Sequence, residues 1–160
     1  MTEKINKKIL FSLLTLIFFV LISAFVIEYK FGHKPCKLCI YERVPYFLSI
    51  FLILKILLTK GYEKITLLLL CLVFLVSSTL AFYHFGIEQG IFKESLSCVS
   101  SNLSESLSKE QILEELKQNA VSCKNVSFKI LGFSLAAINT ILSLILTAVF
   151  VKLYRDFAND

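Results

Sequence analysis

Long stretches of hydrophobic residues alternate with short polar segments along this chain of 160 residues. Three of the stretches contain no charged residue: 9–27, 65–85 and 130–151. Each is close to the ~20 residues that a helix needs to cross the hydrocarbon core of a bilayer. A fourth stretch, 38–59, is weaker, but its few charged residues lie near its ends, where long side chains can reach water. The pattern predicts four membrane-spanning helices.

The composition agrees with a membrane protein. Hydrophobic residues make up 56% of the chain and charged residues only 18%, whereas a soluble domain carries ~25% charged residues. The mean hydropathy is +0.75. We therefore expect an all-α fold, a four-helix transmembrane bundle that forms one domain over residues 1–160. Stretch 9–27 exceeds the usual ~7–15-residue core of a signal peptide and lacks a small-residue cleavage site, so we expect a retained helix.

Basic residues set the expected orientation of the bundle. With the N-terminus inside, one side collects Lys4, Lys7, Lys8, Lys55, Lys60, Lys64, Lys152 and Arg155. The segment 86–128 falls on the other side and holds six acidic residues against four lysines. This bias favours cytoplasmic N- and C-termini and an external loop. The net charge of +5 then reflects topology, and we expect no nucleic acid as a partner.

Residues 106–121 of the loop, SLSKEQILEELKQNAV, have the pattern of a short amphipathic helix. Ser108 and Gln111 have capping-box spacing, and the apolar residues recur with helical period. We expect this helix to lie on the bilayer or the bundle. A docking helix for a partner protein is the alternative.

Five cysteines are present, and four of them fall on the predicted external side. Cys71 lies among leucines in the third stretch, where a thiol packs as a small apolar group. Cys36, Cys39, Cys98 and Cys123 form an even set, which in an oxidising compartment indicates two disulfides. Four cysteines allow three pairings, and the sequence leaves the pairing open.

The two pairs differ in kind. A disulfide between Cys98 and Cys123 would stabilise the loop by roughly 3 kcal/mol, so a structural bridge is the ordinary interpretation. Cys36 and Cys39 form a CxxC motif that opens a helix, and a helix N-terminus favours the thiolate. Arg43 shares their face at helical spacing, one turn deeper. A guanidinium one turn below a thiolate would stabilise its negative charge. Alternatively, Arg43 anchors the helix at the membrane interface.

Other polar residues near the motif have simpler interpretations. Glu42 is expected to point away from the cysteines, towards a nearby lysine. His84 ends the third stretch at the depth of Arg43, where it is either an interfacial polar tip or a hydrogen-bond donor to a ligand held between helices. Zinc ligation by the CxxC pair, His33 and His84 is chemically suitable. It would leave the two loop cysteines unexplained, so we expect no metal.

These residues resemble the disulfide bond formation protein B (DsbB) family, quinone-reducing thiol oxidases of the bacterial inner membrane. The likeness rests on PCKLCIYERVP opening the second stretch, on YHFGIEQG closing the third and on the spaced loop cysteines. It covers nearly the whole chain. Vitamin K epoxide reductase-like enzymes share the bundle and the CxxC chemistry, but their motif lies later in the chain.

The resemblance implies a thiol relay. Cys98 and Cys123 would form the loop disulfide that oxidises a periplasmic thioredoxin-fold dithiol protein similar to DsbA. During this exchange Cys98 would form the mixed disulfide with the partner protein. Cys123 would pass reducing equivalents to Cys36, and Cys39 would face the quinone.

The same resemblance assigns quinone binding to Arg43 and His84. The cofactor would be ubiquinone or menaquinone, which the sequence does not distinguish. The loop has few prolines and aromatic residues between its cysteines, which departs from the family and bears on the partner's identity. The alternative function is a structural four-span membrane protein with a disulfide-stapled loop.

Overall fold

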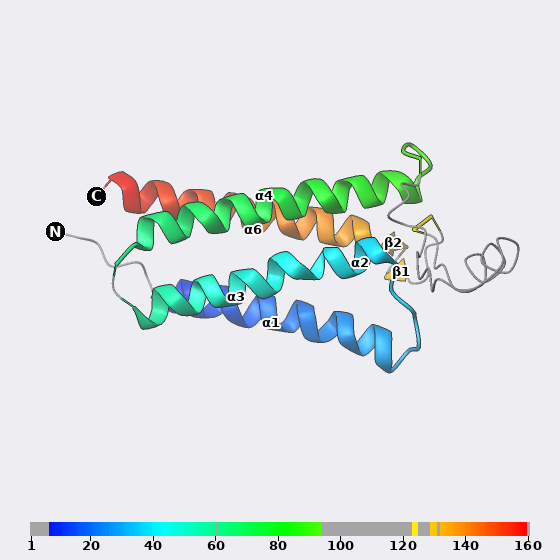
Figure 1. Cartoon of the computed structure of the whole chain (residues 1–160), viewed down its shortest axis with the longest axis horizontal. Helices are drawn as coiled ribbons and strands as arrows, with labels where there is room; N and C mark the ends of the chain where they lie inside the picture. Colours follow the sequence, from blue (N-terminus) through cyan, green and yellow to red (C-terminus); the bar gives the residue numbers. More distant parts are fainter. Residues whose placement is uncertain (1–6, 60, 94–122, 125–128, 131, 160) are drawn as a thin grey trace, which may run out of the picture.

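Four long helices run lengthwise beside one another in the computed structural model, with one short helix ahead of the second long one (Figure 1). The structure describes residues 7–59, 61–93, 123–124, 129–130 and 132–159. The helices are α1 (Lys7–Tyr29), α2 (Lys37–Tyr41), α3 (Arg43–Leu58), α4 (Glu63–Glu88) and α6 (Leu135–Asn159). The start of α1 and the end of α6 lie at the same end of the bundle (Figure 1).

Three of these helices are long and apolar enough to cross a membrane, namely α1, α4 and α6. They cover the predicted stretches 9–27, 65–85 and most of 130–151. The helix α3 has 16 residues, so the fourth span stays a prediction. Among the described residues, all regular structure is helical except one small hairpin; the hydrophobic pattern predicted the helices and not the hairpin.

The predicted second span, 38–59, is divided in two. The helix α2 ends at Tyr41 and α3 begins at Arg43, with Glu42 between them. The ring of Pro45 explains this interruption, because a proline lacks the N–H that would bond to the fourth carbonyl before it, that of Tyr41, and collides with it. Glu42 itself keeps a helical backbone, and its N–H bonds to the Leu38 carbonyl at 2.9 Å.

The last helix begins later than its hydrophobic stretch predicts. Residues ahead of it form an antiparallel hairpin of β1 (Lys129–Ile130) and β2 (Phe133–Ser134). Gly132 lies in the turn with φ +88°, a conformation that glycine adopts without strain. Ser134 then caps α6, because its Oγ accepts a hydrogen bond from the Ala137 N–H at 3.2 Å.

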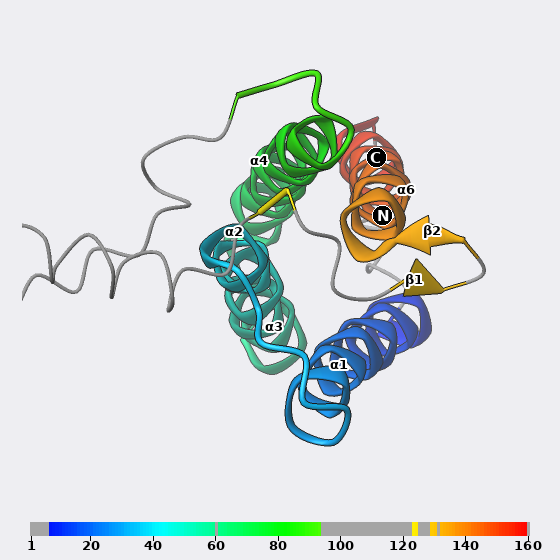
Figure 2. The same cartoon turned by 90° about the vertical axis from the view of Figure 1, so that its right-hand side faces the viewer.

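The long helices pack around an apolar core in the order α6, α4, α3, α1, with α3 in contact with both α4 and α1. The helix α4 packs most extensively on α6, and α1 packs on α3. Phe74 of α4 stacks on Phe150 of α6 and meets the ring of Tyr46 edge-on. The helices α1 and α6 are not among the closely packed pairs, and Figure 2 shows the hairpin beside the start of α6. The lack of close packing between α1 and α6 bears on how a ligand could reach the interior of the bundle.

The predicted external loop, 86–128, lies largely outside the described residues. Cys98 and the predicted helix 106–121 are in that part. At the start of the loop, α4 ends at Glu88, and the ring of Phe92 folds back onto Gly86. A Cβ at Gly86 would lie 2.2 Å from that ring, so only glycine permits the contact.

Candidate functional site

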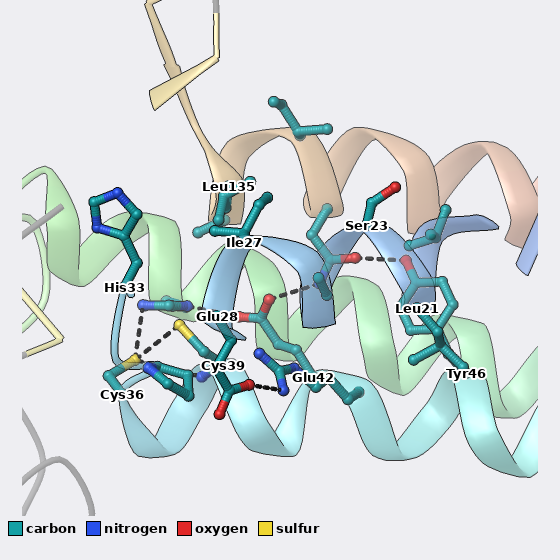
Figure 3. Close-up of a pocket in the computed structure, with 18 of the residues that line it drawn as sticks. Leu21, Ser23, Ile27, Glu28, His33, Cys36, Cys39, Glu42, Tyr46 and Leu135 are labelled. Carbon is teal, nitrogen blue, oxygen red and sulfur yellow. Dashed lines mark hydrogen bonds and ion pairs between the residues drawn. The ribbon is translucent and has the colours of Figure 1, made fainter. Parts of the chain in front are cut away.

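A cavity of about 270 Å³ opens near the α2 end of the bundle. Side chains from α1, α2, α3, α4 and α6 line it, together with Cys123. Its polar groups gather on the α2 side, and apolar side chains of α1 and α6 such as Ala24 and Leu142 form much of the remaining wall. Figure 3 shows Cys36, Cys39 and Tyr46 along it. The size is near the lower end of small-molecule sites, ~300–1,000 Å³.

The CxxC motif stands at the N-terminus of α2, as its sequence predicts. Cys36 is the N-cap residue, and its sulfur accepts a hydrogen bond from the Cys39 N–H at 3.4 Å. The two Sγ atoms lie 3.1 Å apart. Both thiols are free in this structure, and their spacing permits a disulfide after a small approach of the two side chains.

The surroundings of Cys36 favour its thiolate. The hydrogen bond with Cys39 is the main influence, and with the help of His84 it outweighs burial and lowers the pKa of Cys36 to about 4 from its ordinary 9.0. A low pKa keeps the sulfur in the thiolate form, which is the reactive form in thiol–disulfide exchange.

Cys123 lies in the same buried cluster as Cys36. The two share this cluster with Leu38 and Ile87, and Cys39 packs against it. Cys123 is disulfide-bonded, and its partner lies outside the described residues. The structure thus brings three of the four predicted relay cysteines to one cavity; the fourth, Cys98, is not described.

His84 approaches Cys36 from α4. Its Nε2 lies 3.5 Å from the Cys36 Sγ, and its Nδ1 lies 2.7 Å from Glu42 Oε1. The other Glu42 oxygen accepts a hydrogen bond from Asn139 Nδ2 at 2.6 Å. The carboxylate accepts from both sides, so Nδ1 is the protonated nitrogen facing Glu42 and Nε2 is directed at the sulfur.

The hydrogen bonds continue into the bundle core. Tyr46 donates its hydroxyl hydrogen to Asn139 Oδ1, and the same hydroxyl lies 3.2 Å from Ser143 Oγ. Ser143 Oγ in turn lies 3.1 Å from Ser77 Oγ. This series, which we call the polar chain, runs from Cys36 through His84, Glu42, Asn139, Tyr46 and Ser143 to Ser77.

Arg43 has an acidic partner that the sequence did not suggest. Its Nη1 donates to Glu28 Oε2 of α1, and its guanidinium lies 5.0 Å from the centre of the Phe25 ring. Both Arg43 and Glu28 line the cavity. An arginine has five N–H donors, so this pair leaves others for a second acceptor.

The prediction for Glu42 was wrong. Its side chain is 9% exposed and is directed at His84 and Asn139, not at a lysine. Glu42 keeps a helical backbone with φ −63° and ψ −21°, so the error concerned its partners, which come from α4 and α6 and which the pattern of one segment does not give. Asn139 and Tyr46 were missed as well. The signal for Asn139 was its spacing with Ser143, four residues on, which puts two polar side chains on one face of a membrane helix.

The structure also places Cys71 and His33, the other cysteine and histidine for which the sequence made a prediction. Cys71 packs in the apolar core with 8% exposure, which confirms the packing role. His33 lines the cavity, but it is outside the group formed by Cys36, Cys39 and His84, whose ligand atoms all lie within 4.8 Å of one another. The zinc set with His33 is therefore not assembled among the described residues.

Comparison with known proteins gives a family match over most of the chain. The family model described as disulfide bond formation protein DsbB matches residues 6–153. A curated relative, the "Uncharacterized protein RP370" of Rickettsia prowazekii (strain Madrid E), is 35% identical over 136 residues. The alignment covers 84% of this chain and 79% of the relative. No solved structure matches significantly.

Proposed function

This chain belongs to the DsbB family of disulfide bond formation proteins, and we propose that it transfers electrons from a periplasmic DsbA-like dithiol protein to a membrane quinone. At the family level it is a multi-pass membrane thiol oxidoreductase of disulfide-bond formation. The observation that carries the finer proposal is the shared cavity. Cys36, Cys39, Cys123, Arg43 and His84 all line it.

The cysteine positions support a relay by thiol–disulfide exchange. Cys123 and Cys36 share one buried cluster, so a Cys123 thiolate would attack the Cys36 sulfur of an oxidised CxxC pair. The new bond joins Cys123 to Cys36, and the electrons of the broken bond leave on Cys39 as a thiolate. Cys98 would exchange with the thioredoxin-fold partner. Each exchange conserves the number of disulfides, so a final electron acceptor is needed.

A quinone fits the inner end of this relay. When bound, it would supply the acceptor for the two electrons and two protons released by a dithiol that becomes a disulfide. The cavity offers apolar walls for a ring and polar groups at one side for its oxygens. The Arg43 N–H groups not used by Glu28 would donate to a carbonyl oxygen. Ubiquinone and menaquinone share this chemistry.

The His84–Glu42 pair supports a role in moving the thiol proton. With Nδ1 held by Glu42, His84 presents Nε2 to Cys36 at 3.5 Å. A histidine so placed takes up a proton when Cys36 is deprotonated and returns it when the sulfur leaves. Glu42 and Asn139 do not contact the sulfur, so they act as positioning residues through the imidazole.

The packing of the helices supports access from the bilayer. The cavity is lined by both α1 and α6, which are not among the closely packed helix pairs. The residues exposed near this part of α1 are apolar, for example Ile22 and Val26 at 57% and 41% exposure. A lipid-soluble acceptor would therefore reach the cavity sideways between these two helices.

The charge pattern supports a bacterial inner-membrane location with cytoplasmic termini. The end of the bundle where α1 begins and α6 finishes (Figure 1) carries Lys7, Lys8, Lys64, Lys152 and Arg155. The cysteine cavity lies towards the opposite end, where the loop emerges. That end would face the periplasm, where a disulfide donor works.

The test is turnover by the purified protein in detergent. A reduced thioredoxin-fold partner is supplied and quinone absorbance is followed, with Cys39→Ser as the inactive variant and Cys71→Ser as the matched control. We expect turnover by wild type and Cys71→Ser and none by Cys39→Ser. Folded wild-type protein that reduces neither ubiquinone nor menaquinone would overturn the proposal and favour a disulfide-stapled structural protein.

A further inference from the structure

The two CxxC sulfurs and one imidazole nitrogen form a compact group of potential metal ligands. The Sγ atoms of Cys36 and Cys39 and one ring nitrogen of His84 all lie within 4.8 Å of one another. In tetrahedral zinc sites, bond lengths of ~2.3 Å to sulfur and ~2.0–2.1 Å to nitrogen put neighbouring ligand atoms roughly 3.5–3.8 Å apart. The observed Cys36–His84 distance is 3.5 Å, and the sulfurs at 3.1 Å need only a small opening.

The histidine is already oriented as a metal ligand. Histidines that bind metals usually give their other ring N–H to a carboxylate, which fixes the ring and raises its basicity. Glu42 accepts from His84 Nδ1 at 2.7 Å and is itself held by Asn139. When the imidazole is neutral and its proton is on Nδ1, the lone pair of Nε2 is therefore on the side of the ring that faces Cys36.

Glu88 is the nearby carboxylate that would complete the set; it lies outside the group of three ligand atoms, so its side chain would have to move towards the two sulfurs. It follows His84 by one helical turn, its side chain is 6% exposed, and its Oε1 lies 3.9 Å from His84 Nε2. Its other oxygen, Oε2, is buried and has no hydrogen-bond partner among the described residues. A buried carboxylate oxygen without a donor is costly, and nothing in the proposed relay uses Glu88. A cation at the cluster would satisfy it.

We propose that the reduced form of this protein binds a thiophilic divalent cation such as Zn²⁺ through Cys36, Cys39, His84 and Glu88. Glu42 would hold the imidazole ring through its hydrogen bond with His84 Nδ1. Two thiolates and a carboxylate give the site the negative charge that a divalent ion neutralises, and binding releases the thiol protons without transferring electrons. Oxidation of the CxxC pair removes both thiolates, so the oxidised protein lacks the site.

Metal binding would inhibit the relay. Thiolates that are held by a metal are not free to form a disulfide, so a bound ion would keep the CxxC pair reduced. This consequence rests on the proposed function, whereas the binding itself does not. Excess thiophilic metal would thus stop electron flow reversibly.

Metal binding is tested first, without any activity measurement. In a Cys98→Ser, Cys123→Ser background, only Cys71 and the CxxC pair remain as thiols. The protein is reduced, freed of reductant and titrated with Zn²⁺ against a chromophoric chelator. We expect one Zn²⁺ per reduced chain and none after oxidation of the CxxC pair. Thermal unfolding of each variant verifies that it is folded, and the reduced full chain serves as a second background.

Single substitutions identify the ligands. We expect His84→Ala and Glu88→Gln each to weaken Zn²⁺ binding at least tenfold, and Glu42→Gln to weaken it by about 10- to 100-fold as a supporting residue. Glu63→Gln, at the other end of the same helix, is the matched control and should leave affinity unchanged. Equal affinity of all four variants and the parent, or no binding by the reduced protein, would overturn the site.

Inhibition is measured afterwards on the full chain. Quinone reduction should fall as Zn²⁺ is added and recover when a chelator removes it, and Glu88→Gln should need at least tenfold more Zn²⁺. Zn²⁺ that binds without slowing turnover would overturn the inhibitory role. A chain that binds Zn²⁺ but never reduces quinone would instead refute the proposed function and leave the metal site standing.

Discussion

Glu42 and His84 meet across two segments of the bundle, with 2.7 Å between Glu42 Oε1 and His84 Nδ1 although 42 positions separate them in sequence. The side chains are 9% and 4% exposed. A buried carboxylate is stable only when donors surround it, and here His84 and Asn139 both donate to it. The pair fixes the ring nitrogen that faces Cys36, and this relationship is the source of the first prediction.

Glu42→Gln should slow quinone reduction by about 10- to 100-fold, because a charged hydrogen bond worth roughly 1.5–3 kcal/mol is replaced by a neutral one. The amide keeps the shape of the side chain but no longer stabilises a protonated His84. The pH dependence of kcat/KM should therefore move as well, which a purely structural role would not cause. Glu63→Gln is the control, and an unchanged rate and pH profile for Glu42→Gln would refute the positioning role.

Asn139→Ala should destabilise the protein by about 1–3 kcal/mol, because it removes the donor to Glu42 Oε2 and leaves the Tyr46 hydroxyl with Ser143 but without its acceptor Asn139 Oδ1. The measurement is the free energy of unfolding in detergent. Thr140→Ala is the matched control on the same helix, since the Thr140 hydroxyl donates to the Ala136 carbonyl of its own helix. Equal losses for the two variants would show that the polar chain contributes nothing beyond local packing.

Arg43→Met should raise the KM for quinone by about tenfold or more, because a charged donor in the cavity is lost. Glu28→Gln should have a smaller effect, since Arg43 keeps its charge and its contact with the Phe25 ring. A double-mutant cycle separates the two roles. If both single variants and the double variant show the same KM, Arg43 acts only through its ion pair with Glu28.

Ala24→Trp should block the cavity from the α1 side. Ala24 lines the cavity, so an indole there would occupy space that a quinone needs, and the KM for quinone should rise without loss of CxxC reduction by the partner. Ile22→Trp is the control, because Ile22 is 57% exposed on the outer surface of the same helix. Equal kinetics of Ala24→Trp and wild type would place the quinone elsewhere.

The reduced Cys36 should ionise near pH 4, because the hydrogen bonds of Cys39 and His84 lower its pKa to about 4. The ultraviolet absorbance of the thiolate, followed in the Cys98→Ser, Cys123→Ser background, measures this. The pKa is lower in the folded protein than in the unfolded chain. The stabilisation from the thiolate is therefore complete above the unfolded value near 9.0 and is lost as the pH falls towards 4. A titration near pH 9 would contradict the prediction.

The sequence by itself determined the helices and the chemistry. Uncharged stretches such as 65–85 can satisfy their backbone in a bilayer only as helices, so length and hydropathy were enough to locate α1, α4 and α6. The CxxC motif is local as well: Cys36 and Cys39 are three residues apart at a helix start, and their contact follows from helical geometry.

The tertiary structure decided which polar residues meet. Glu42 and Asn139 lie 97 positions apart, and no periodicity within one segment relates them. Packing of α4 on α6 and on α3 brought His84 and Asn139 to the carboxylate of Glu42. The ion pair between Arg43 of α3 and Glu28 of α1 likewise depends on how two helices pack. Sequence patterns describe one helix face at a time, whereas these contacts depend on the relative rotation of several helices, which only the packed bundle fixes.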